Sequence, residues 1–123
     1  MRVSTGGAPG AIGPYSQGID TGALVFVAGQ VGIDPATGEL VDGIEAQTER
    51  VMRNIAAVLD AAGLSMADVV KTTILLADIG DFTTVNTVYG RFVGDPPPAR
   101  ATYAVAGLPR GARIEIEAIA ARG

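Results

Sequence analysis

The residues best suited to chemistry in this sequence are an arginine and a glutamate in its last quarter. Arg100 follows the rigid run Pro96–Pro98 and Ala99, and it opens an alternating apolar-polar segment. Glu115 lies between two isoleucines in a segment typical of a strand. A planar guanidinium binds carboxylates or phosphates through paired hydrogen bonds, and a carboxylate can hold a water molecule or move a proton. The two residues indicate a site for a small anion, although a solvated arginine and a wet sheet face would explain the same pattern.

Four further residues are candidates that also have a plain structural explanation. Tyr15 follows a Gly-Pro pair at a predicted strand start, where a tyrosine most often packs at an edge. Asn86 falls in the middle of a predicted helix, so it is either exposed or reaches a site. Lys71, the only lysine, is expected to form an ion pair at a sheet edge or an interface rather than act as a nucleophile. Gly29 directly follows a predicted strand and offers exposed backbone N–H groups, which alone is a weak signal.

The absence of cysteine and histidine narrows the chemistry sharply. It excludes disulfides, thiolate nucleophiles, histidine-based triads and Cys/His zinc sites, and we expect neither a metal nor a cofactor. Nine basic and thirteen acidic residues give a net charge of −4 without a basic run, so nucleic acid is not an expected partner. No segment approaches the roughly 20 apolar residues of a membrane span, and we expect a cytoplasmic protein.

Periodicity and turn signals predict the elements that must position these residues. The predicted strands are 15–20, 23–28, 69–77, 99–105 and 113–120, and the predicted helices are 44–62 and 82–93. Asp42 with Glu45 is the pattern of a capping box for the first helix, which Gly63 should end. Asp81 should cap the second helix, whose predicted apolar face is Phe82, Val85, Tyr89 and Phe92. Residues 29–43 are predicted to form a loop with turns.

The order β-β-α-β-α-β-β predicts an α+β protein of one domain, residues 1–123. Its expected architecture is a two-layer sandwich, a mixed sheet with both helices on one face. Glu115 and Glu117 alternate with isoleucines, so both carboxylates should leave the sheet on the same face. Nothing remains to cover that face, while 48% of residues are hydrophobic and only 18% are charged. We therefore expect the chain to associate with copies of itself.

Four segments together resemble the Rid/YjgF family of reactive-intermediate imine deaminases, over about residues 8–120. They are GAIGPYSQGI (10–19), VAGQVGIDPATGEL (27–40), DVVKTTILLADIGDFTTVNTVYGRFV (68–93) and PPARATYAVAGLPRGARIEIEAIA (97–120). The resemblance implies a chorismate-mutase-like fold and a homotrimer with active sites in the clefts between subunits. It also implies hydrolysis of 2-iminopropanoate and 2-iminobutanoate, released by pyridoxal-phosphate enzymes such as threonine or serine dehydratase, to 2-oxo acids and ammonia.

The resemblance also assigns roles to individual positions. Arg100 matches the arginine that binds the substrate carboxylate, and Glu115 matches the glutamate that positions or activates water. Tyr15 matches the tyrosine of the GPYSQ-like block and completes the expected catalytic residues. The expected substrate-binding residues are Gly29, Asn86 and Thr102.

Two positions depart from the family pattern. Thr102 stands where the family often has cysteine, which should matter little because the contact usually assigned there is a backbone carbonyl. Ala28 stands where the family often has serine, so the pocket lacks a hydroxyl and the substrate preference stays open. One alternative is a deaminase of the same fold for another small imine or enamine, such as aminoacrylate or aminomuconate. The other is a non-enzymatic trimeric module that binds a 2-oxo acid or acts as a holdase.

Overall fold

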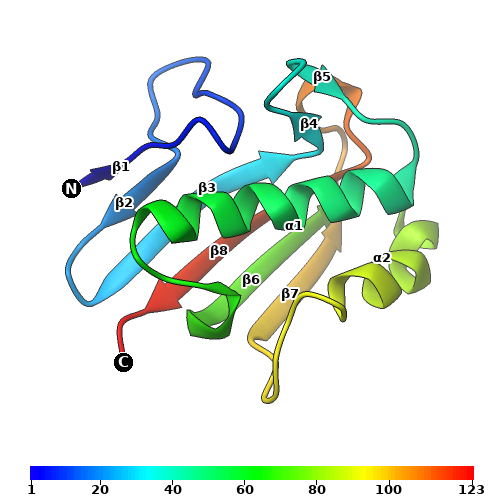
Figure 1. Cartoon of the computed structure of the whole chain (residues 1–123). Helices are drawn as coiled ribbons and strands as arrows, with labels where there is room; N and C mark the ends of the chain where they lie inside the picture. Colours follow the sequence, from blue (N-terminus) through cyan, green and yellow to red (C-terminus); the bar gives the residue numbers. More distant parts are fainter.

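The computed structural model describes all 123 residues and contains a six-stranded mixed sheet, a two-stranded sheet and two α-helices (Figure 1). The large sheet has the order β1-β2-β3-β8-β6-β7, in which only β6 and β7 are parallel. The predicted α+β class and mixed sheet are confirmed. The strands are β1 (Arg2–Val3), β2 (Gly18–Asp20), β3 (Leu24–Val31), β4 (Ile33–Asp34), β5 (Glu39–Leu40), β6 (Val69–Leu76), β7 (Ala99–Ala104) and β8 (Ile114–Ala121). The helices are α1 (Ile44–Ala61) and α2 (Phe82–Tyr89).

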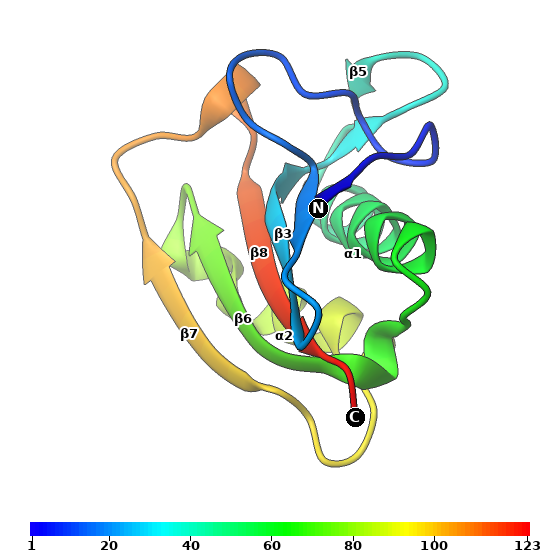
Figure 2. The same ribbon diagram turned by 90° about the vertical axis from the view of Figure 1, so that its left-hand side faces the viewer.

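Both helices pack on one face of the large sheet, and the opposite face is left open (Figure 2). The apolar stripe of α1 explains its docking, because Val51, Ile55, Val58 and Leu59 recur at helical spacing and are fully buried. Fully burying one such side chain stabilises the fold by about 1.5–3 kcal/mol, so this stripe dominates the packing of α1. Neither helix combines the length and apolarity that crossing a membrane requires.

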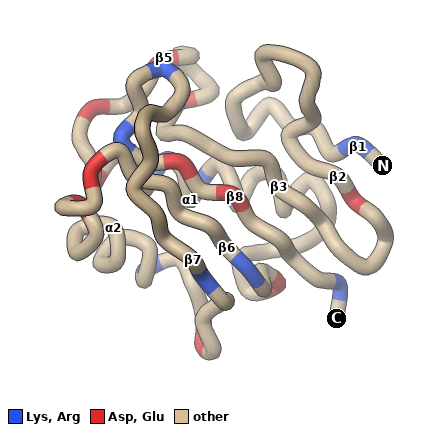
Figure 3. Tube along the Cα trace, turned by 180° about the vertical axis from the view of Figure 1, so that it is seen from behind, with Lys and Arg blue, Asp and Glu red and all other residues tan.

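The open sheet face carries the odd-numbered residues of β8. Ile114 and Ile116 are buried under the helices, while Glu115 and Glu117 lie on the open face, as the alternation predicts. Figure 3 views the sheet from this side as a Cα trace, on which acidic positions along β8 lie beside a basic position on β6. Exposed apolar side chains, Phe26 and Tyr103 among them, share the face. An apolar sheet face without a covering layer is suited to an interface.

The predicted capping box at the start of α1 is wrong. Gly43 is the N-cap residue, and no side chain caps this end of the helix. Gly43 has a φ of 89°, a conformation that favours glycine and brings the chain into the helix without Asp42. The predicted C-terminal stop is confirmed: Gly63 has a φ of 77°, and the N–H of Leu64 donates to the carbonyl of Leu59 at 2.9 Å.

The second helix is shorter than predicted and begins differently. It ends at Tyr89, and the Asp81 side chain does not cap it. Both Asp81 carboxylate oxygens instead accept from Nη2 of Arg113 at 3.0 Å, which connects the helix start to the residue just before β8. Asp78 accepts from the N–H of Gly80 and caps the preceding 3₁₀ turn. Asp81, which the local pattern predicts to be an N-cap, therefore forms an ion pair with a residue distant in the sequence instead.

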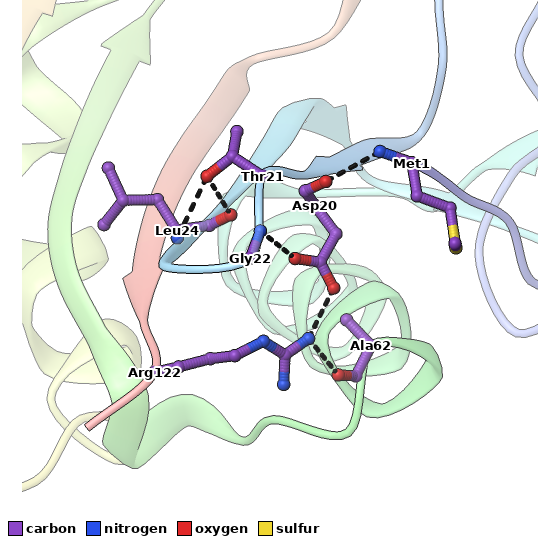
Figure 4. Close-up of polar contacts among 7 residues, drawn as sticks. All are labelled: Met1, Asp20, Thr21, Gly22, Leu24, Ala62 and Arg122. Atoms are coloured by element: carbon purple, nitrogen blue, oxygen red, sulfur yellow. Dashed lines mark hydrogen bonds and ion pairs between the residues drawn. The ribbon is translucent and has the colours of Figure 1, made fainter.

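A polar network links the ends of β2 and β8, which flank β3 in the sheet (Figure 4). Asp20 accepts from the N–H of Gly22 at 2.8 Å and pairs with Arg122. Arg122 also donates to the carbonyl of Ala62 at 2.8 Å, just beyond α1. The carboxylate of Asp20 thus connects a hairpin turn, a helix end and the last strand.

Replacing Asp20 with asparagine should lower the melting temperature at neutral pH. The Gly22 N–H bond and the Arg122 side chain hold the pKa of Asp20 below its usual 3.8, so this stabilisation exists above the unfolded-state pKa. It is lost as the pH falls through the folded-state pKa, and the gap between wild type and variant should then close. Circular-dichroism melts on both sides of that range test this, with Asp42→Asn as the control that leaves the melting temperature unchanged. A gap that persists in acid would contradict it.

Candidate active site

The middle of β3 is distorted where it faces Glu115 of β8. The register between the two strands shifts between Val27 and Gln30, which marks a β-bulge. Gly29 lies inside this bulge, next to the carboxylate of Glu115. A Cβ at position 29 would lie 2.5 Å from Oε2 of Glu115, closer than real contacts allow. Only glycine therefore leaves room for the carboxylate there.

The environment of Glu115 favours its neutral form. The carboxyl group is partly buried and makes no hydrogen bond or ion pair within the chain. Burial raises the pKa of Glu115 above its usual value, and the negative charge of Glu117 on the same face raises it further. A carboxylate with a raised pKa and a free lone pair is suited to accept a proton from water.

Tyr15 approaches the same region from the N-terminal arm. It lies before β2 rather than inside a strand, which corrects the predicted strand start. Tyr15 and Gly29 line one cavity of about 450 Å³, whose rim includes Arg110. The arm is held by the buried Gln17, whose Nε2 donates to the carbonyls of Thr5, Ala8 and Pro9 at 2.8–3.3 Å. We call Tyr15, Gly29 and Glu115 the glutamate group.

Arg100 lies on the opposite face of the sheet. It is paired in register with Thr72 of β6, which is fully buried on the face that the helices cover. Its Cζ lies 5.5 Å from the ring centre of Phe82 and 5.2 Å from that of Tyr89, both on α2. No acidic side chain pairs with Arg100 within the chain. Its guanidinium is thus held near two aromatic rings with its N–H groups unpaired.

Asn86 and Thr102 belong to the same side as Arg100. Thr102 follows Arg100 by two residues and pairs with the buried Ile74, so both side chains share the helix-covered face. Asn86 lies on α2 between the two aromatic residues. Oδ1 of Asn86 and Oγ1 of Thr102 are buried without any hydrogen-bond partner. Because buried polar atoms are rarely left unpaired, these two atoms are suited to receive a partner from outside the chain. We call Asn86, Arg100 and Thr102 the arginine group.

The structure therefore brings the six predicted residues together in two groups of three, not in one site. Glu115 is paired with Leu75 of β6 and Arg100 with Thr72, three residues apart on the same strand. Positions an odd number apart on a strand face opposite sides of the sheet. Within one chain, the side chains of Arg100 and Glu115 therefore leave the sheet on opposite faces.

The structure also shows where Lys71 and Ala28 lie. Lys71 lies on β6, an interior strand, and forms no ion pair within the chain, so the predicted pair at a sheet edge is absent and the pair at a subunit interface stays a prediction. Ala28 lines a separate open-face cavity of about 430 Å³ with Lys71 and Glu117, not the cavity of Tyr15 and Gly29. No cluster of three or more acidic side chains is arranged to hold a metal ion.

Replacing Gly29 with alanine should displace the Glu115 carboxylate while the fold persists. The new Cβ meets the end of a flexible side chain, which can rotate away at small cost. We expect a melting temperature close to that of the wild type and, in the imine hydrolysis that the family resemblance implies, a fall in turnover of roughly tenfold or more, as for a misplaced catalytic group. Gly94→Ala is the control, because a Cβ there meets nothing within 4 Å. Wild-type turnover in Gly29→Ala would show that the position of this carboxylate does not matter.

Comparisons with known proteins agree over nearly the whole chain. A family model described as "Endoribonuclease L-PSP" matches residues 5–122, which contain both groups. A human protein named 2-iminobutanoate/2-iminopropanoate deaminase is 49% identical over 122 residues, 98% of this chain and 89% of that protein. The structure of the E. coli YjgF gene product has a TM-score of 0.96 at 42% identity, covering 100% of this chain and 99% of the other. The structure of E. coli TdcF with bound serine has a TM-score of 0.96 at 41% identity, with the same coverage.

Proposed function

The chain belongs to the Rid/YjgF family, and from this premise we propose that it hydrolyses 2-iminopropanoate and 2-iminobutanoate to 2-oxo acids and ammonia. The observation that carries the proposal is Arg100, an unpaired guanidinium beside two buried polar atoms that lack partners. Such a guanidinium is suited to a bidentate contact with a carboxylate. E. coli TdcF was crystallised with serine, which is also a short molecule with a carboxylate at C1.

In the proposed reaction, Arg100 binds the substrate carboxylate and fixes the position of the imine carbon. The substrate reacts as the protonated imine: the Glu115 carboxylate takes a proton from a water molecule as the water oxygen adds to the imine carbon, which gives a neutral carbinolamine with a hydroxyl and an NH₂ group. Glu115 then gives this proton to the amine nitrogen, and the C–N bond breaks with its electron pair on the departing ammonia. The hydroxyl returns its proton to the Glu115 carboxylate as the C=O bond of the 2-oxo acid forms, and this proton passes to solvent. Oδ1 of Asn86, which lacks a partner in the chain, is suited to accept from the nitrogen of the substrate. The raised pKa of Glu115 suits a group that both accepts and returns a proton.

This mechanism requires two chains, because the two groups lie on opposite sheet faces in one chain. We propose a homotrimer in which the arginine group of one subunit meets the glutamate group of the next. The uncovered apolar sheet face supports such an assembly, since it offers an interface that the helices do not use. Light scattering should give three times the 12.5 kDa mass of the chain. A monomer would overturn both the assembly and the mechanism.

Subunit complementation tests the shared site directly. Arg100→Ala and Glu115→Gln should each be nearly inactive alone. Refolded together in equal amounts, they should recover about a quarter of wild-type activity, because each site has an even chance of an intact arginine and of an intact glutamate. Mixing the two folded proteins without exchange should recover nothing. A refolded mixture that stays inactive would show that the two residues do not act across subunits.

The chemistry is tested by trapping the imine that threonine dehydratase releases. Semicarbazide captures the imine faster than it captures 2-oxobutanoate, so the protein should reduce the early rate of semicarbazone formation. An unchanged rate would overturn the proposed activity. Binding of 2-oxobutanoate without turnover would favour the ligand-binding module, and turnover confined to aminoacrylate or aminomuconate would favour the other deaminase.

A further inference from the structure

The aromatic residues around Arg100 have no role in the reaction described above. We propose that Phe82 and Tyr89 are positioning residues, which hold the guanidinium of Arg100 in the orientation that binds a carboxylate. This inference rests on the proposed function of Arg100. It concerns residues that the sequence indicates only as the apolar face of a helix.

The position of both rings follows from helical spacing. Phe82 and Tyr89 are seven residues apart on α2 and thus lie on one stripe, with Asn86 between them. Both ring centres lie within 6 Å of the guanidinium carbon, 5.5 Å for Phe82 and 5.2 Å for Tyr89. This is the range in which a cation is attracted to the face of a ring. Two rings on one rigid helix therefore restrict where the guanidinium can lie.

Tyr89 is itself fixed by a buried hydrogen bond to the strand beside Arg100. Its hydroxyl lies 2.7 Å from Oγ1 of Thr72, and Tyr89 is 5% exposed while Thr72 is fully buried. Thr72 is the residue paired in register with Arg100. The bond thus connects the ring on α2 to the strand position opposite Arg100, so the ring and the arginine backbone keep a constant separation.

Aromatic partners serve this site better than an acidic partner would. A carboxylate beside Arg100 would neutralise its charge and occupy the N–H groups that the substrate needs. An aromatic ring attracts the cation and leaves the in-plane N–H groups free. The three arginines that do form ion pairs, Arg53, Arg113 and Arg122, lie elsewhere in the fold. The two rings therefore hold the guanidinium of Arg100 in place without neutralising its positive charge.

Phe82 offers the cleaner test, because it is 38% exposed and its replacement should leave the fold intact. We expect Phe82→Leu to weaken binding of 2-oxobutanoate roughly 2- to 5-fold by calorimetry. KM for the imine should rise by the same factor, with kcat within about twofold of wild type. Phe82→Tyr should restore both values. Tyr89→Phe keeps the ring and loses the Thr72 bond, so it should give a smaller loss of the same kind.

Two comparisons separate a positioning role from general packing. Binding of 2-oxobutanamide, which lacks the carboxylate charge, should be unaffected by Phe82→Leu. In an Arg100→Ala background, Phe82→Leu should have no further effect on 2-oxobutanoate binding. If Phe82→Leu binds 2-oxobutanoate like the wild type, or weakens both ligands equally, the inference is wrong. If Arg100→Ala itself binds 2-oxobutanoate like the wild type, the proposed role of Arg100 in the function is wrong, whatever Phe82→Leu shows.

Discussion

Arg100→Ala is expected to lower kcat/KM for 2-iminobutanoate by roughly 10²- to 10⁴-fold, the cost of two charged hydrogen bonds at about 1.5–3 kcal/mol each. Arg100→Lys should recover only part of this loss, because an ammonium keeps the charge but not the planar pair of donors. The fold should persist, since Arg100 is exposed and has no ion pair to lose. Coupled assay with threonine dehydratase and thermal melts measure the two effects separately.

The matched control for Arg100 is Arg91→Ala. Arg91 is an exposed arginine just beyond α2, and it belongs to neither group of site residues. The same change of charge there should leave kcat/KM within about twofold of the wild type, as for surface substitutions in general. Equal losses in the two variants would show that the net charge of the surface, and not a contact with the substrate, governs turnover.

Local sequence pattern predicted those features that depend on one element at a time. The alternation in β8 placed Glu115 and Glu117 on one face, and glycine at position 63 marked the end of α1. Each of these depends on backbone geometry that the neighbouring residues determine. Residue type and spacing indicated five of the six site residues as candidates, and the resemblance to a known family added Thr102 and the role of each. Neither predicted how the six residues divide between the two faces of the sheet.

The features that were missed depend on which segments become neighbours. Strand β8 lies between β3 and β6, so the bulge at Gly29 meets Glu115 across a pairing of segments 86 residues apart. Asp81 has a side chain that suits an N-cap, yet it pairs with Arg113, because the fold brings an arginine to it. Phe82 and Tyr89 had an adequate explanation as core residues. Only the position of Arg100 on the adjacent strand gives them a second role.

Glu115→Gln is expected to abolish most turnover and, at the same time, to stabilise the protein at neutral pH. Loss of a general base lowers kcat by roughly 10²- to 10⁴-fold. The effect on stability has the opposite sign because burial, and then Glu117, raise the pKa of Glu115 in the folded state. A group with a raised folded-state pKa contributes stability below its unfolded-state pKa, and this is lost as the pH rises through the folded value. Glutamine has no charge to bury, so the variant avoids that loss.

The melting temperatures of wild type and Glu115→Gln should therefore agree in acid and diverge as the pH rises above the usual pKa of 4.5, with the variant higher. Glu117→Gln is the matched comparison on the same strand face. It keeps the base but removes the neighbouring charge, so the acidic limb of the pH-rate profile should move to lower pH. A Glu115→Gln variant that is less stable than wild type at neutral pH would mean that the carboxylate has a stabilising partner in the assembled protein. Such a partner would have to come from another subunit, since the chain itself provides none. The sign of the change in melting temperature thus distinguishes two roles of Glu115. A higher melting temperature in the variant indicates a catalytic group that destabilises the fold, and a lower one indicates a group that stabilises the assembly.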